Sequence, residues 1–277
     1  MVGVCVVRNT SLIAQRDKGH MRLLHSVASK IVPDMTRFSI FLIALCGLAL
    51  PAKAQDGSAT VFAAASLRGV LEDLAEVAPM PLTLAFGGSG TMARQVATGA
   101  PADVVILASA DWMLWLVGQG TPMADAPRDV ARNRLVVIAA DGSAPLKQAG
   151  DLTARLAGGR LAMGQRDAVP AGSYARQWLI DAHLWDALRG QLAETDNVQA
   201  ALALVARGDA PFGVVYASDA LAEPAVSVVW AIPADAHDPI TYPAGALSEA
   251  GAAVVDYLTS APAQAVFARH GFAPVIQ

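Results

Sequence analysis

The stretch VFAAASLRGVLEDLA, residues 61–75, changes character at Ser66. The run before this serine is apolar, as in a buried strand. After it, apolar residues recur on one face of a helix: Leu67, Val70, Leu71 and Leu74. Acidic residues fall on the opposite face: Glu72, Asp73 and Glu76. Ser66 therefore stands where a strand ends and a helix begins.

The rest of the chain repeats this order of strand and then helix. The runs typical of buried strands are TVFAA from 60, LTLAF from 82, DVVIL from 103, RLVVIA from 134, RLAMG from 160, FGVVY from 212, VSVVWAI from 226 and ITYPAGAL from 240. Helical patterns separate them, and one of these ends at Gly208 after a face made of Val198, Ala201, Leu202 and Val205. Such alternation predicts an α/β fold with parallel sheets.

Two further junctions carry a serine at the start of a predicted helix. Ser89 lies in FGGSGTMARQ, residues 86–95, and Ser173 lies in VPAGSYARQWL, residues 169–179. A helix N-terminus leaves its first N–H groups unpaired and carries about half a positive charge, so it attracts anions. A serine there either caps the helix or donates to a ligand, and the residues alone leave both readings open.

The N-terminal part has the pattern of a secretory leader. Residues 35–54, MTRFSIFLIALCGLALPAKA, contain one arginine, an apolar run and a small-x-small ending, which predicts a signal peptide cleaved after Ala54. The apolar run is short for a membrane span, although an uncleaved anchor is the alternative. Residues 1–34 are expected to be an upstream extension, with Met35 as the true start. Export of this kind predicts a periplasmic protein.

Cysteine and charge limit the chemistry of the mature chain. Cys5 and Cys46 are the only cysteines, both precede Ala54, and bulky Leu45 argues against lipid attachment at Cys46. A mature chain without cysteine has no disulfide and no thiolate ligand for a metal. Taking the seven Lys/Arg and two Asp before Gln55 from the totals of 20 and 24 leaves 13 basic and 22 acidic residues, a net charge of −9. Such a surface repels nucleic acid, so a bound anion needs local donors.

Motifs for catalysis are weak. The turn GGSGT lacks the Gly-Lys-Ser/Thr of a P-loop and the second glycine of a Gly-x-Ser-x-Gly elbow. The mature histidines are far apart in sequence and form no metal-ligand motif: His183, His237 and His270. A secreted serine hydrolase that uses Ser66 or Ser89 remains an alternative of lower rank.

Several segments together resemble the periplasmic molybdate-binding proteins of ABC importers, the ModA family. They are TVFAAASL, FGGSGTMARQVATGAPADVVILAS, VPAGSYA, NVQAALALVARGDAPFGVVYASDA and AQAVFARHGF, in the same order and spanning about 60–272. The resemblance implies an α/β periplasmic binding protein of type II, with two lobes and the ligand in the cleft between them. It implies a monomer that is not an enzyme, has no cofactor and delivers molybdate or tungstate to a membrane permease.

The resemblance also implies the lobes and the site. Residues 57–137 plus 239–277 would form the first lobe and 138–238 the second, with crossings in LVVIAA and ITYPA. The ligand contacts of the family fall on Ser66 and Ser89 in the first lobe and on three residues in the second: Ala171, Val198 and Tyr216. Molybdenum would be bound only as its oxyanion. The turn Gly87-Gly88-Ser89-Gly90 has fewer serines than relatives often carry, which predicts a more flexible turn and a change in affinity or ligand choice.

The implied contacts have one chemistry. Serine and tyrosine hydroxyls and the backbone N–H groups of Ala171 and Val198 are neutral donors, which suit an oxyanion that carries no proton. A monoprotonated phosphate would leave its own hydroxyl buried and unpaired, at about 1–3 kcal/mol. Sulfate or another tetrahedral oxyanion on the same fold is the closer alternative ligand.

Overall fold

The computed structural model describes residues 57–275. The predicted extension 1–34, the signal peptide 35–54 and both cysteines lie outside the described residues. The described residues group as one compact unit. Of the helices described, none is both long and apolar enough to cross a membrane.

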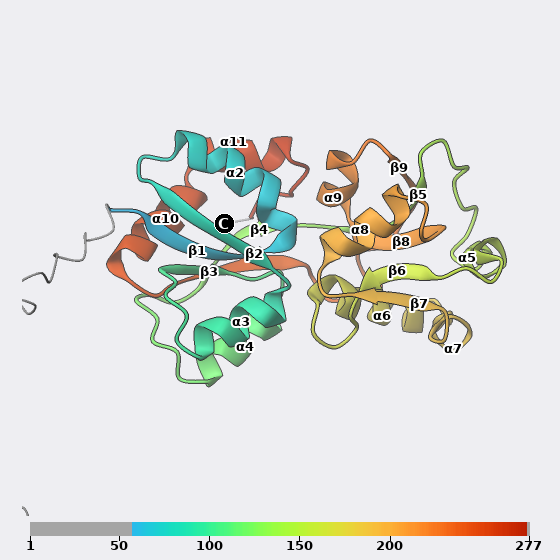
Figure 1. Ribbon diagram of the computed structural model, residues 1–277, viewed down its shortest axis with the longest axis horizontal. Coiled ribbons are helices and arrows are strands. Elements are labelled where there is room, and N and C mark those ends of the chain that lie inside the picture. The colour runs from blue at the N-terminus through green and yellow to red at the C-terminus, as the bar shows by residue number, and fades with distance from the viewer. Residues whose placement is uncertain (1–56, 276–277) are drawn as a thin grey trace, which may run out of the picture. The chain divides into compact units, whose positions relative to one another are not determined.

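In the described residues, the first of two sheets is mixed and five-stranded (Figure 1). Its strands, in spatial order, are β2 (Leu82–Gly87), β1 (Ala59–Ala64), β3 (Val104–Ile106), β10 (Thr241–Ala246) and β4 (Arg128–Arg132). Strands β1, β2 and β3 are parallel, whereas β10 runs antiparallel to both of its neighbours. The helices of this half are η1 (Ala65–Leu67), α2 (Arg68–Val77), α3 (Ser89–Ala97), α4 (Ala110–Gly118), α10 (Glu249–Thr259) and α11 (Ala261–Arg269).

The second sheet within the described range repeats this plan. Its strands, in spatial order, are β7 (Leu192–Thr195), β6 (Leu161–Gly164), β8 (Phe212–Tyr216), β5 (Leu135–Ala140) and β9 (Val226–Ala231). Strand β5 is antiparallel to both β8 and β9, and β6 is parallel to β7 and β8. The helices of this half are α5 (Asp151–Leu156), α6 (Pro170–Asp181), α7 (Trp185–Leu188), α8 (Val198–Ala206) and α9 (Ala217–Ala222). The predicted α/β class is confirmed, but the sheets are mixed and not purely parallel, because β10 and β5 run antiparallel to their neighbours.

Burial explains why the helices form where the pattern predicts. The apolar face of α2 is buried and its acidic face is exposed. The predicted face of α8 is buried in the same way, since Val198, Ala201, Leu202 and Val205 are each at most 5% exposed. Helix α8 ends before Gly208, whose φ of +77° is the left-handed conformation that glycine adopts most readily at a helix end.

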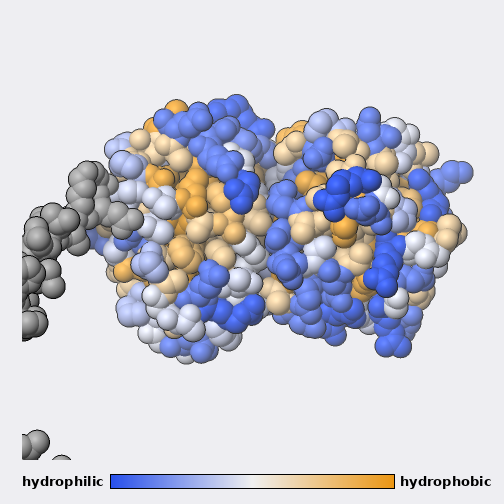
Figure 2. All heavy atoms as spheres, in the orientation of Figure 1, coloured by the Kyte–Doolittle hydropathy of each residue, from blue (hydrophilic) through white to orange (hydrophobic). Residues whose placement is uncertain are grey.

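The sequence patterns did not predict two strands, β4 and β7, and both lie at sheet edges. An edge strand pairs on one side only and tolerates charged side chains, so its sequence lacks a continuous apolar run. The sequence of β4 is RDVAR and that of β7 is LAET. The edge strand β2 differs, because apart from the exposed Thr83 its side chains are apolar and partly buried. An apolar band covers the part of the surface where Figure 1 has this strand (Figure 2).

The chain crosses between the two sheets twice. The first crossing is short, from Arg132 at the end of β4 to Leu135 at the start of β5. The boundary predicted after residue 137 therefore cuts through β5, which pairs along its length with strands of the second sheet. The second crossing follows β9 and ends at Thr241. We call the parts built on the first and second sheets the first and second lobes; the two lobes as separate folding units remain a prediction.

Candidate functional site

One pocket is lined by segments from both lobes. Its wall includes every residue that the resemblance placed in the site: Ser66, Ser89, Ala171, Val198 and Tyr216. The cavity is small. The volume within which the centre of a water molecule could move is about 10 Å³, which is enough for one small molecule or ion and not for a larger solute. The five residues are at most 7% exposed. The fold thus brings together residues that are up to 150 positions apart.

Ser66 ends a chain of buried hydrogen bonds that links the two crossings. Its Oγ lies 3.0 Å from the hydroxyl of Tyr242, the second residue of β10. Asn133, in the first crossing, donates from Nδ2 to the Tyr242 hydroxyl at 3.2 Å and to Ser218 Oγ at 2.8 Å. The Asn133 Oδ1 accepts the N–H of Arg134 at 2.9 Å, so the amide can only donate to Tyr242.

The hydrogen bond between Ser66 and Tyr242 joins two hydroxyl groups, and either group can be its donor. Tyr242 already accepts from Asn133, so we infer that the Tyr242 proton is the one donated to Ser66. The Ser66 oxygen then acts as an acceptor toward Tyr242, and the Ser66 proton is free to point at the pocket. Burial raises the pKa of Tyr242 well above its ordinary value, so this hydroxyl keeps its proton.

The oxygen of Ser89 also accepts a hydrogen bond from the protein, in this case from a backbone N–H group. Ser89 is the first residue of α3, 1% exposed, and its Oγ accepts the backbone N–H of Ala108 at 3.0 Å. With that acceptor position filled, the hydroxyl proton of Ser89 is also free for the pocket. Neither serine caps its helix through its side chain, because no side-chain cap is present on η1, α2 or α3. The plain capping interpretation therefore does not describe Ser66 or Ser89.

The second lobe contributes two helix starts. Ala171 is the second residue of α6, after Pro170, and Val198 is the first residue of α8. Within the described chain the N–H groups of Ala171 and Val198 have no protein acceptor. Proline has no N–H, so Ala171 supplies the first free donor of its helix. Ser173, the third serine at a predicted helix start, does not line the pocket. Its backbone N–H donates to the carbonyl of Val169 at 3.0 Å, within the first turn of α6.

Tyr216 closes the site at the end of β8. Its hydroxyl is buried and has no hydrogen-bond partner among residues 57–275. Burial raises its pKa well above the ordinary value, so it is a neutral donor. Beside it, buried Asp219 accepts the N–H of Tyr216 at 3.3 Å and the Nε2 of Gln199 at 2.6 Å. Burial raises the pKa of Asp219 to about 8, against the opposing effect of these two hydrogen bonds.

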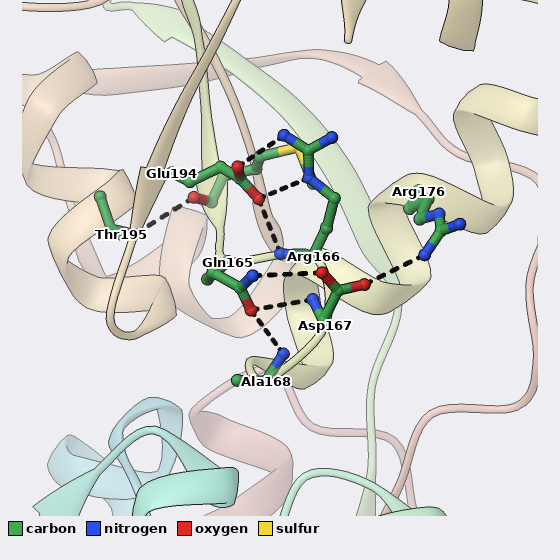
Figure 3. Close-up of polar contacts among 8 residues, drawn as sticks. Gln165, Arg166, Asp167, Ala168, Arg176, Glu194 and Thr195 are labelled. Carbon is green, nitrogen blue, oxygen red and sulfur yellow. Dashed lines mark hydrogen bonds and ion pairs between the residues drawn. The ribbon is translucent and has the colours of Figure 1, made fainter. Parts of the chain in front are cut away.

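A polar cluster holds the loops that lead into α6 and α8 (Figure 3). Arg166 donates to the Glu194 carboxylate from Nε at 2.9 Å and from Nη2 at 2.6 Å. These bonds lower the pKa of Glu194. Gln165 Oε1 accepts the N–H groups of Asp167 at 2.9 Å and Ala168 at 2.6 Å. The cluster therefore fixes the backbone just before Ala171 and Val198 without entering the pocket.

The pocket wall is uncharged. Its side chains are aliphatic, hydroxyl or amide groups, and no histidine of the described chain lines it. His270 lies against Asp73 at 2.8 Å, and His237 packs near Tyr174 with ring centres 5.8 Å apart. No group of three or more His, Asp or Glu in residues 57–275 is arranged to hold a metal ion. The arrangement offers hydrogen-bond donors, and a serine nucleophile here would lack a base.

Sequence reasoning missed the residues that support the site. Tyr242 and Asn133 are 109 positions apart, and Tyr242 and Ser66 are 176 apart. For Asn133 the sequence offers one local signal, a polar residue shortly before the buried run LVVIAA. For the two glycines beside Ser89, Gly88 and Gly90, the sequence indicates only that they lack hydroxyl groups.

Known proteins resemble this chain over most of its length. Residues 59–273 match the family described as bacterial extracellular solute-binding protein. The chain is 38% identical to the molybdate-binding protein ModA of Escherichia coli, over 80% of this chain and 91% of that protein. It is 36% identical to the ModA of Haemophilus influenzae, over 83% and 94%. The solved structure of the Azotobacter vinelandii periplasmic molybdate-binding protein shares the fold, with a TM-score of 0.69, 24% identity and coverage of 79% and 100%.

These matches confirm the resemblance seen in the sequence and the two-sheet α/β fold. Members of such a family capture solutes and are not enzymes, so the hydrolase alternative is not favoured. On the strength of the match over residues 59–273 and of the identity to its curated relatives, the chain belongs to the bacterial extracellular solute-binding protein family.

Proposed function

We propose that this protein captures molybdate, and also tungstate, in the bacterial periplasm and delivers the anion to the membrane permease of an ABC importer. A signal peptide at residues 35–54 would direct its export, and it would act as a monomer without a cofactor. The observation that carries the proposal is a single uncharged pocket lined by Ser66, Ser89, Ala171, Val198 and Tyr216. The names of the curated relatives support the same ligand class.

The proton order in the site supports a ligand that only accepts. Ser66 and Ser89 each have an oxygen occupied by an internal donor, Tyr242 or the Ala108 N–H. Each would then turn its proton to the ligand, as would the hydroxyl of Tyr216. A fully deprotonated dianion such as molybdate accepts at every oxygen. A monoprotonated phosphate would bury a hydroxyl with no acceptor, which costs about 1–3 kcal/mol.

The number of donors is sufficient for tight binding. Hydrogen bonds to a charged group contribute about 1.5–3 kcal/mol each, so five give roughly 8–15 kcal/mol before ordering and closure. Micromolar to nanomolar affinity requires about 8–12 kcal/mol. The start of α3 and the starts of α6 and α8 add partial positive charge at the same place.

Titration calorimetry with sodium molybdate and sodium tungstate tests the proposal. The mature chain should bind each anion at one to one with no turnover, and sulfate should compete only weakly because its smaller tetrahedron reaches fewer donors. Ser66→Ala and Ser89→Ala should each weaken molybdate binding by about 10-fold or more, the effect of one lost hydrogen bond to a charge. Absence of heat with both anions at micromolar protein would disprove the function, and sulfate that displaces molybdate at equal concentration would reassign the ligand.

A further inference from the structure

The glycine just before Ser89 has no conformational reason to be glycine. Gly88 has φ of −63° and ψ of 139°, which any L-residue adopts easily. It is the N-cap of α3, where glycine is tolerated but Ser, Asp and Asn stabilise a helix better. Both facts predict that a residue with a side chain would serve the first lobe as well or better. The reason for glycine has to be sought outside the turn.

The reason lies in the second lobe. A Cβ on Gly88 would lie 2.4 Å from the carbonyl oxygen of Asp196 and 3.6 Å from Cγ2 of Val169. The three atoms nearest to this position belong to Asp196 and Val169, in the two second-lobe loops that lead into α8 and α6. The contact at 2.4 Å is far shorter than the roughly 3.0 Å that a Cβ tolerates, so a methyl group would require movement of about 0.6 Å or more.

Hydrogen bonds hold the residues on both sides of the Asp196 carbonyl, so this carbonyl resists a movement of its own. The single hydroxyl proton of Thr195 is shared between the carbonyl oxygens of Asn197, 2.8 Å from Oγ1, and Met163, 3.2 Å from Oγ1. The Asn197 side chain caps α8 by accepting the N–H of Ala200 at 3.0 Å. Glu194, which precedes Thr195, accepts two hydrogen bonds from the Arg166 side chain (Figure 3). Relief of the clash therefore falls on the separation of the lobes.

We propose that Gly88 sets how closely the two lobes approach and thereby the size of the anion cage. This inference rests on the proposed function and adds a residue that determines affinity without contacting the ligand through a side chain. An alanine at 88 would keep all five proposed contact residues but hold the second-lobe donors, Ala171 and Val198, away from the anion. Gly90 makes a similar approach, with its Cβ position 2.6 Å from the Ala168 carbonyl. That position is also 2.6 Å from the Trp112 ring of its own lobe. A substitution at Gly90 would therefore strain the first lobe as well as the contact between the lobes, and the two effects could not be distinguished.

The test compares Gly88→Ala with Gly150→Ala, each as the mature chain. Gly150 lies at the start of α5 with φ of −60°, and a Cβ there meets nothing within 4 Å, so the control makes the same chemical change outside the interface. Calorimetry with sodium molybdate, small-angle scattering with and without the anion, and thermal unfolding of the anion-free protein are measured for wild type and both variants.

We expect Gly88→Ala to lower molybdate affinity about 10- to 150-fold, which is the effect of losing one hydrogen bond to a charged group. Its molybdate-bound state should be more expanded than that of wild type, while its anion-free melting temperature stays the same. Gly150→Ala should match wild type in affinity and scattering. Equal affinity and equal compactness of Gly88→Ala and wild type would overturn the role of Gly88 and leave the function intact. Absence of binding by wild type would instead remove the proposed function.

Discussion

The two buried tyrosines, Tyr216 and Tyr242, provide a paired test of the site. Their rings lie 6.0 Å apart and both are at most 1% exposed, so their environments are closely matched. They differ in the hydroxyl group. That of Tyr242 is bonded to Ser66 and Asn133, whereas that of Tyr216 has no partner among the described residues.

The two Phe substitutions should therefore have opposite signatures. Tyr216→Phe removes a hydroxyl that bonds to no group among residues 57–275, so the free energy of unfolding should stay the same or rise. If that hydroxyl donates to the anion, molybdate affinity should fall by about 1.5–3 kcal/mol, or roughly 10- to 150-fold. Tyr242→Phe deletes two internal hydrogen bonds and leaves Asn133 with an unpaired donor, so unfolding should become easier by about 1–3 kcal/mol.

Urea unfolding without anion gives the stability of each variant, and calorimetry with sodium molybdate gives the affinity. Tyr242→Phe should also weaken binding, because Ser66 loses the donor that orients its proton. The diagnostic result is a large affinity loss with no stability loss, found in Tyr216→Phe alone. A Tyr216→Phe protein that binds molybdate as wild type does would refute the assignment of Tyr216 to the ligand, and a stability loss as large as that of Tyr242→Phe would refute the hydrogen-bond reasoning.

Two other predictions concern groups next to the site. The pKa of Asp219 is raised by burial to about 8, above its unfolded value, so the stability that it contributes is full below about pH 4 and is lost as pH rises through 8, at up to ~1.4 kcal/mol per pH unit. In Asp219→Asn the unfolding free energy should lose this slope between pH 5 and 8, and an unchanged slope in urea titrations would contradict the effect. Asn133→Asp should lower molybdate affinity at least about 10-fold by calorimetry, because a carboxylate accepts the Tyr242 proton and turns Ser66 away from the anion. Ser218→Ala, which removes the other acceptor of the Asn133 amide, should keep affinity within roughly threefold, about 0.7 kcal/mol, and an equal loss in both variants would rule out the proposed proton order.

Much of the fold follows from the sequence by itself. Central strands such as β5 and β8 are buried on both faces, so they appear as continuous apolar runs, and the helices α2 and α8 display one apolar face each. The strand-to-helix junctions at Ser66 and Ser89 are local features too. Together with the resemblance to a known family, they predict the fold class and the residues that meet in the pocket.

Only the tertiary structure showed which residues from distant elements lie next to one another. Hydrophobic spacing records how one element is buried, and it contains no information about which distant residue lies opposite. The edge strands β4 and β7, the early first crossing before β5 and the Asn133–Tyr242–Ser66 chain are all relations between separate elements. Gly88 is the clearest case, because its backbone conformation is ordinary and only the Asp196 carbonyl, 108 positions away and in the other lobe, gives a physical reason for the missing side chain.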